Sequence, residues 1–117
     1  MSQYKKNKTF EIRLKESTIM KDKYPKNVPV IVDKGSQDKI LPDIDKNKFL
    51  VPGDLEFGKF IAVIRRRLKI DSTIAIFTFV GKNVLAMTSE TMSSVYDKHK
   101  DEDGFLYVTY CGENTFG

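Results

Sequence analysis

The residues whose types and spacing could do chemistry stand in the last thirteen positions of this 117-residue chain, FLYVTYCGENTFG (105–117). Residues 105–110 alternate as a strand that is apolar or aromatic on both faces, which is typical of a strand inside a sheet. The polar segment that follows ends on Gly117. Glycine has no Cβ, so it can enter a narrow enzyme channel and present its carboxylate there. The alternative is an ordinary frayed terminus.

The other candidate for chemistry is a thiol nucleophile, because Cys111 and His99 are the only cysteine and histidine of the chain. Nucleophilic catalysis needs the two side chains in contact and the imidazole oriented by a third group. His99 falls on the apolar stripe of an expected short helix, so the sequence favours a protein that is not an enzyme. The chain has no phosphate loop, dinucleotide fingerprint or metal-ligand cluster, and we expect no metal and no cofactor.

Composition limits the remaining possibilities. A chain of 117 residues with a 40% hydrophobic fraction forms one domain with one core. A single cysteine fits a reducing compartment, and no apolar run approaches the roughly 20 residues that span a bilayer. We expect a monomer in the cytoplasm, whose membrane association is covalent or comes from a partner.

Positive charge gathers in residues 1–30, where eight Lys or Arg residues face three acidic ones. Such a surface could meet acidic peptides, anionic lipid or nucleic acid, or could simply be a solvated helix face. The aromatic residues follow core-like periodicity and not a basic, aromatic surface stripe, so we expect no nucleic-acid partner.

The elements that must position the tail follow from periodicity and from capping and breaking residues. Thr9 is a candidate N-cap for a helix over 10–24 with a stripe of Phe10, Leu14, Ser17 and Met20 or Tyr24, and residues 3–8 add a short turn. Asp54 is expected to cap a main helix over 55–69. Further elements are strands over 28–32, 48–51, 74–80 and 105–110 and a short helix over 88–100.

This order, without the first helix, is the β-grasp arrangement of ubiquitin. The expected fold class is therefore α+β, a ubiquitin-like β-grasp with a four-stranded mixed sheet and extra N-terminal helix or helices. Within one compact domain we divide the chain into a helical extension (1–24), the β-grasp core (25–110) and a flexible conjugation tail (111–117).

Several long segments resemble the ubiquitin-like autophagy modifiers, the autophagy-related protein eight, GABARAP and light-chain family. The resemblance runs from about Phe10 to Gly117, and its most specific motifs are DIDKNKFLVPGDL and DGFLYVTYCGENTFG. It implies a modifier and not an enzyme. Activating and conjugating enzymes would transfer the Gly117 carboxylate to the amine of phosphatidylethanolamine, a cysteine protease would process and delipidate the protein, and Phe116 would anchor the tail in the enzymes' grooves.

The resemblance also implies a peptide site at the edge strand 48–51, which would bind cargo receptors and adaptors carrying aromatic-x-x-aliphatic motifs. The implied aromatic pocket comprises Glu16, Met20, Pro29, Lys48, Leu50 and Phe105. The implied aliphatic pocket comprises Phe49, Val51, Pro52, Leu55, Phe60 and Val63. Acidic residues beside the motif would meet Lys46, Lys48 and Arg67, and the enzymes would meet a face bearing Phe77 and Phe79.

Each of these assignments has a plainer alternative. Lysines on a short edge strand also prevent unwanted strand pairing, and Leu55, Phe60 and Val63 are also ordinary core residues. Asn27 and Phe49 stand where the family commonly has arginine and tyrosine. The rival function is a β-grasp adaptor that binds motif peptides and is never conjugated. For the modifier, we expect the cytoplasm and, after lipidation, the membrane of autophagosomes or other cytoplasmic vesicles.

Overall fold

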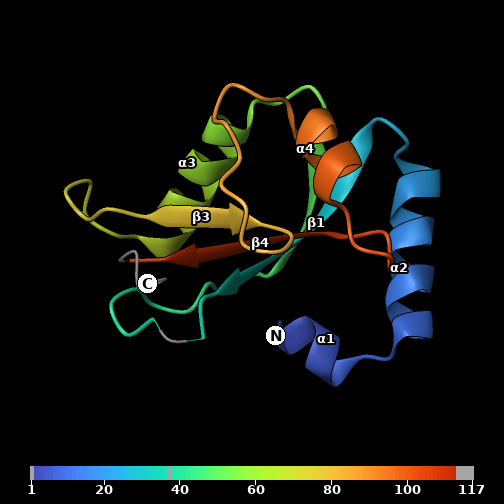
Figure 1. Cartoon of the computed structure of the whole chain (residues 1–117), viewed down its shortest axis with the longest axis horizontal. Helices are drawn as coiled ribbons and strands as arrows, with labels where there is room; N and C mark the ends of the chain where they lie inside the picture. Colours follow the sequence, from blue (N-terminus) through green and yellow to red (C-terminus); the bar gives the residue numbers. More distant parts are fainter. Residues whose placement is uncertain (1, 37, 113–117) are drawn as a thin grey trace.

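The computed structural model describes residues 2–36 and 38–112, and a four-stranded sheet lies at its centre (Figure 1). The strands are β1 (Asn27–Lys34), β2 (Lys48–Pro52), β3 (Phe77–Val80) and β4 (Leu106–Cys111), in the order β2-β1-β4-β3. β1 and β4 run parallel, while β2 and β3 are each antiparallel to their neighbour. The expected mixed β-grasp sheet is confirmed.

Four helices surround this sheet: α1 (Gln3–Asn7), α2 (Phe10–Lys23), α3 (Phe57–Leu68) and α4 (Met92–His99). Figure 1 shows α3 and α4 on one side of the sheet, α1 on the other, and α2 at the end away from the arrowhead of β4. No helix among the described residues combines the length and the apolar character needed to cross a bilayer.

The main core lies between the sheet and α3, and strand alternation explains its composition. The inward residues of the two central strands are Val28, Val30, Val32, Leu106, Val108 and Tyr110, which are buried with Phe57, Phe60, Ile64 and Leu68 of α3. The opposite face of the sheet carries a smaller buried cluster of Tyr4, Ile31 and Phe105. β4 therefore has apolar neighbours on both faces, as its sequence pattern predicts.

Pro29 occupies the position near the start of β1 that a strand proline requires. Pairing of β1 with β4 begins at Val30, so the missing N–H of Pro29 removes no bond to that central neighbour. Its side chain is buried, opposite Leu50 of β2.

Both later helices begin after the residues expected from sequence, because the intervening backbone is bonded elsewhere. Asp54 does not cap α3, and Leu55 lies before the helix with its carbonyl accepting from the Met92 amide at 2.7 Å. The Phe57 amide donates to the Glu90 carbonyl at 2.8 Å, which keeps residues 88–90 out of α4. α4 instead begins after Thr91, whose hydroxyl oxygen caps the Ser94 amide at 3.2 Å.

The third strand is shorter than the apolar run 74–80 predicts. Only Phe77–Val80 pairs with β4. The Ile74 amide closes a turn onto the Asp71 carbonyl at 3.0 Å, and Arg65 donates to the Ile74 carbonyl at 2.7 Å. These bonds hold the first half of the run in a connection that packs on the core without joining the sheet.

For α2, the N-cap prediction is confirmed, and the apolar-stripe prediction is wrong except at Ser17, which is buried, and Met20, which packs on the cluster of Tyr4, Ile31 and Phe105. Thr9 caps the Ile12 amide, but Phe10, Leu14 and Tyr24 are each about 40–47% exposed and Ser17 is the only buried residue of the helix. The Ser17 hydroxyl donates to the backbone carbonyl of Asp103 at 2.5 Å, so a small polar contact holds this part of the helix.

The same region contains the most deeply buried acidic side chain among the described residues. Asp103 is 0% exposed, and its carboxylate accepts from Arg13 at 2.9 Å, from the Tyr107 hydroxyl at 2.6 Å and from the Phe105 amide at 2.9 Å. Gly104 follows at φ +88, where a Cβ would overlap the Ser17 hydroxyl. Glycine is required there both for the backbone conformation and for the approach of α2.

Candidate functional site

β2 is an edge strand, since it pairs with β1 alone among the described residues. Its side chains alternate between two environments. Phe49 and Val51 are buried against the α3 side of the sheet, whereas Lys48 and Leu50 are half-buried on the other side. An extended peptide that paired with the free edge of β2 would therefore meet a different surface on each side of the strand.

The side toward α3 gathers five of the six residues assigned to the aliphatic pocket. The rings of Phe49 and Phe60 meet edge to face with centroids 5.6 Å apart, and both side chains are less than a tenth exposed. Val51 is also buried, and Leu55 and Val63 pack half-buried against this core. Pro52, the sixth, is exposed at the end of the strand. Leu55 and Val63 thus offer more surface to a ligand than the three core residues.

The side toward α2 gathers the residues assigned to the aromatic pocket. Lys48 forms an ion pair with Glu16 of α2, and Leu50 stands opposite Pro29. Met20 packs on the cluster that contains the fully buried Phe105. The structure brings residues from four separate segments to one side of β2, and their role in peptide binding remains a prediction.

The aromatic side also contains Tyr4, which sequence reasoning missed. The Tyr4 ring contacts Phe105 edge to face at 5.4 Å between centroids, and the Lys48 ammonium lies 5.5 Å from the Tyr4 centroid. One local signal was available: Ser2 is a residue type that caps helices, and its hydroxyl oxygen accepts from the Tyr4 amide at 3.2 Å.

The Glu16 carboxylate pairs with the basic residues on the aromatic side of β2. It accepts from Lys8 at 2.7 Å and from Lys48, so one carboxylate joins two lysines from different segments. Burial alone would raise the pKa of Glu16, but the hydrogen bonds from Lys48 and Lys8 outweigh burial and lower the pKa to about 2. The carboxylate therefore stays charged at any physiological pH.

This lowered pKa predicts how Glu16 contributes to stability across pH. Its folded-state value of about 2 lies below the ordinary 4.5, so its stabilisation is complete above about pH 4.5 and disappears as the pH falls toward 2. Glu16→Gln should therefore melt below the wild type at about pH 7, and the gap should close between about pH 5 and pH 2. Thermal melts of both proteins across this range check the prediction, with Glu102→Gln as the control at an exposed acid. A gap that stayed constant with pH would contradict it.

The cations assigned to acidic flanks of a peptide already have partners within the chain. Arg67 makes two hydrogen bonds to Asp45, at 3.1 and 3.3 Å, and Lys48 is paired with Glu16. The Lys46 ammonium lies 5.1 Å from the Phe49 ring centroid. An acidic peptide would thus compete with Asp45 and Glu16 for two of these three cations.

Phe77 and Phe79 lie on the face of the sheet opposite α3. They stand opposite Cys111 and Thr109 of β4, whose side chains alternate with the core residues Val108 and Tyr110. Phe79 is only 6% exposed and Phe77 is half-buried. Burial and recognition by enzymes remain alternative explanations for these two phenylalanines.

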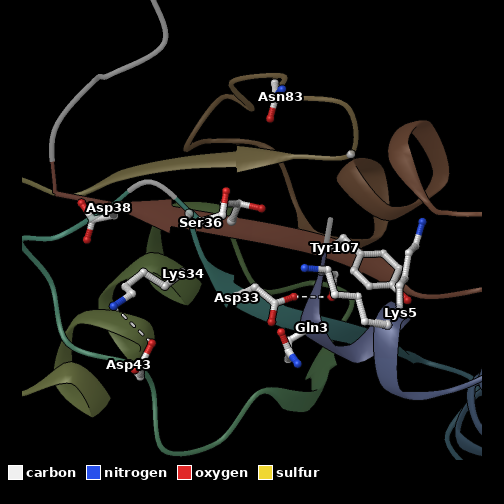
Figure 2. Close-up of a pocket in the computed structure, with 14 residues that line it drawn as sticks. Gln3, Lys5, Asp33, Lys34, Ser36, Asp38, Asp43, Asn83 and Tyr107 are labelled. Carbon is white, nitrogen blue, oxygen red and sulfur yellow. Dashed lines mark hydrogen bonds and ion pairs between the residues drawn. The ribbon is translucent and has the colours of Figure 1, made fainter.

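The same face holds an open cleft of about 770 Å³ between α1, the carboxyl end of β1 and β4. Figure 2 shows Asp33 and Gln3 next to each other, Lys34 with Asp43 to one side of them, and Lys5 and Tyr107 to the other. Four of its charged groups have partners within the chain: Ser2 donates to Asp33 at 2.5 Å, Lys34 pairs with Asp43 at 3.2 Å, and Lys5 pairs with Asp101 at 2.5 Å. Burial raises the pKa of Asp33.

The conjugation residues Phe116 and Gly117 lie outside the described residues. The chain leading to them is fixed up to Gly112, whose amide donates to the Asp38 carboxylate at 2.8 Å. Cys111, expected in the tail, is instead the buried last residue of β4. His99 belongs to α4, and the described residues contain no group of three or more metal-ligating side chains.

A parallel β1–β4 pair, a covering helix α3 and a free edge at β2 define a ubiquitin-like domain. The model of the family described as autophagy protein Atg8 ubiquitin like matches residues 12–117. Autophagy-related protein 8b of Arabidopsis thaliana is 54% identical over 97% of this chain and 92% of its own length. Autophagy-related protein 8 of Mycosarcoma maydis is 51% identical over 99% of this chain and 97% of its own length.

A crystal structure of Trypanosoma brucei ATG8 has the same fold, with a TM-score of 0.89 and 38% identity over 100% of this chain and 99% of that one. The chain therefore belongs to the Atg8 family of ubiquitin-like autophagy proteins, and it is a ubiquitin-like modifier of autophagy.

Proposed function

We propose that this protein is conjugated through Gly117 to the amine of phosphatidylethanolamine and then recruits autophagy cargo at the edge of β2. The family match supports the first part, since it extends through residue 117 and includes the tail motif. The alternating side chains of β2 support the second. In the cell the protein would be cytoplasmic until lipidation places it on autophagosomes or other cytoplasmic vesicles.

The proposed reaction uses the chemistry of a carboxyl group without a neighbouring Cβ. An activating enzyme would adenylate the Gly117 carboxylate with ATP and release pyrophosphate, and an enzyme cysteine would then displace AMP to form a thioester. The lipid amine would then attack the thioester carbonyl, form the amide and release the thiol. An unhindered glycine carbonyl favours this attack, and the two acyl chains of the lipid give stable anchoring. Phe116 would hold the tail in the grooves of these enzymes and of a delipidating protease.

Cargo recruitment would use strand addition at β2. Backbone hydrogen bonds to the edge supply affinity, and the two sides of the strand supply specificity for the aromatic and aliphatic residues of the motif. The partners would be receptors and adaptors with aromatic-x-x-aliphatic segments flanked by acids. Among the described residues Lys46 has no ion pair to give up before it contacts such a flank, whereas Arg67 would have to release Asp45 and Lys48 would have to release Glu16.

The intact mass of the protein from the membrane fraction of its native cells tests conjugation. The proposal expects a species heavier by one phosphatidylethanolamine, with the added mass on the peptide that contains Gly117. If only unmodified chain appeared after autophagy was induced, conjugation would be refuted and the unconjugated adaptor would become the leading account.

Leu50→Ala tests the peptide site. Leu50 is half-buried on the aromatic side of β2, and removal of its side chain should weaken binding of a motif peptide about tenfold, as is usual for a central interface residue. Leu85→Ala, at a side chain that is 65% exposed in the turn after β3, is the matched control and should bind as the wild type does. Isothermal titration calorimetry measures both. Equal affinity in the two variants would place the site elsewhere.

A further inference from the structure

The base of the conjugation tail is bonded to the loop that follows β1 (residues 35–36 and 38–43). The Asp38 side chain in this loop is only 7% exposed. Its Oδ1 accepts a hydrogen bond from the Gly112 amide at 2.8 Å, and its Oδ2 accepts from the Leu41 amide at 2.9 Å. These bonds satisfy a polar group that is otherwise costly to bury. Gly112 is the first residue after β4, so one buried carboxyl group connects this loop to the point where the tail leaves the sheet.

Steric contacts hold Gly112 in the same place. A Cβ at this position would lie 2.8 Å from Cγ2 of Ile40, 2.9 Å from its Cβ and 3.1 Å from Cγ of Leu41. Only glycine permits so close an approach of the backbone. Ile40 and Leu41 therefore cover the Gly112 backbone, and its amide can reach Asp38 because no side chain lies between them.

Other bonds hold the end of β4 without Asp38. The Gly35 amide donates to the Tyr110 carbonyl at 2.8 Å, and the Tyr110 hydroxyl donates to the Pro42 carbonyl at 2.8 Å. On the other side of β4, Cys111 is paired with Phe77 of β3. The bond from Asp38 therefore extends the ordered chain by one residue beyond the strand.

We infer that Asp38 is a positioning residue for conjugation, which holds Gly112 and so fixes the point and direction from which the tail enters the activating enzyme. This inference rests on the proposed conjugation at Gly117. Without the bond, the last point of attachment moves back to Cys111 and the Gly112 backbone is released. Glycine gains more backbone freedom on release than any other residue. Binding to the enzyme would then have to remove that freedom again.

Asp38→Ala tests this role through the kinetics of activation. The exchange of pyrophosphate into ATP, catalysed by the activating enzyme of the same organism, measures KM and kcat for the protein as substrate. KM should rise about five- to 30-fold, the change that corresponds to ordering the backbone of one residue. The kcat should stay unchanged, because a bound tail reacts as before. Hydrogen exchange at the Gly112 amide, followed by NMR, should accelerate roughly tenfold or more.

The same bond can be removed from the side of the donor. Cys111 permits ligation of a synthetic segment 111–117 to residues 1–110, with an ester in place of the Gly112 amide. The refolded full chain lacks only the N–H that Asp38 accepts, and its KM should rise as in Asp38→Ala. Asp38→Ala should add little in this background if the two changes remove one interaction. The ester form also tests the inference if Asp38→Ala does not fold.

Tyr110→Phe is the matched control. It removes the hydrogen bond to the Pro42 carbonyl, which also joins this loop to β4, and leaves the bond between Asp38 and Gly112 in place. This variant should keep the wild-type KM and the wild-type exchange rate at the Gly112 amide. Thermal melts and the affinity for a motif peptide establish that every variant is folded.

The outcomes separate the role of Asp38 from the function on which it rests. If the wild type were not activated at all, the proposed conjugation would be refuted, and the role of Asp38 with it. If the wild type were activated and Asp38→Ala and the ester form kept its KM, conjugation would stand and the role of Asp38 would be overturned. A fall in kcat at constant KM, or unchanged hydrogen exchange at Gly112 in Asp38→Ala, would overturn that role as well.

Discussion

Replacement of Gly117 by alanine is expected to reduce lipid conjugation about 100-fold or more while leaving peptide binding intact. The added methyl group lies beside the carbonyl that must pass through an enzyme channel and accept the lipid amine. Small displacements of a reacting group cost rates of this order. The edge strand of the peptide site, Lys48–Pro52, is far from the tail in sequence, and the Gly117→Ala change adds nothing to it, so its affinity should not change.

The test measures conjugation and peptide binding on the same protein, so a loss of one can be separated from a loss of the other. Mass spectrometry of membrane fractions measures conjugation, and calorimetry with a motif peptide measures the β2 site. Thr115→Ala is the control, because it changes a nearby tail residue and keeps the terminal glycine. If Gly117→Ala were conjugated at the wild-type rate, the assignment of Gly117 would be wrong. If neither protein were ever conjugated, the protein would be an adaptor that binds peptides alone.

Asp103→Ala should lower the free energy of unfolding by about 3–5 kcal/mol, a large part of the 5–15 kcal/mol that is usual for a domain. The substitution removes a fully buried carboxylate and leaves Arg13, whose side chain is 12% exposed, without its partner. The Tyr107 hydroxyl and the Phe105 amide also lose their acceptor. Chemical denaturation of the variant and the wild type measures the loss.

Two further variants distinguish the buried charge from a general effect of losing an aspartate. Asp97→Ala, at an exposed position of α4, should stay within about 0.5 kcal/mol of the wild type. Adding Arg13→Met to Asp103→Ala should recover part of the lost stability, since no uncompensated charge then remains in the site. A double variant no more stable than Asp103→Ala alone would contradict this account.

The strands of the sheet could be predicted from sequence because the pattern of apolar residues within each strand indicates it. Apolar residues on both faces of 105–110 indicate a central strand, and alternation along Lys48–Pro52 separates the two sides of β2. The starts of α3 and α4 could not be predicted in the same way. They are set by backbone bonds between residues 53–58 and 88–93, which are distant in sequence.

The candidate site, too, could be predicted only where local sequence pattern or resemblance determines it. Alternation and family resemblance bring Phe49 and Val51 to one side of β2 and Lys48 and Leu50 to the other. Neither indicates that Glu16 would pair with Lys8 and Lys48 together, or that Tyr4 would lie beneath them. Those contacts depend on how α1 folds back on the sheet. The stripe expected for α2 failed for a related reason, since Ser17 is held by a hydrogen bond and not by apolar burial.

The bond between Gly112 and Asp38 limits how far the proposed lipid-bearing end can travel. Five residues follow Gly112, and a fully extended segment of that length spans at most about 18 Å. A lipidated molecule would therefore stand close to its membrane, on a tether shorter than the 39 Å long axis of the domain. α2 lies at the end of the sheet away from the arrowhead of β4 (Figure 1). α2 would then project away from the anchoring bilayer, toward the cytoplasm.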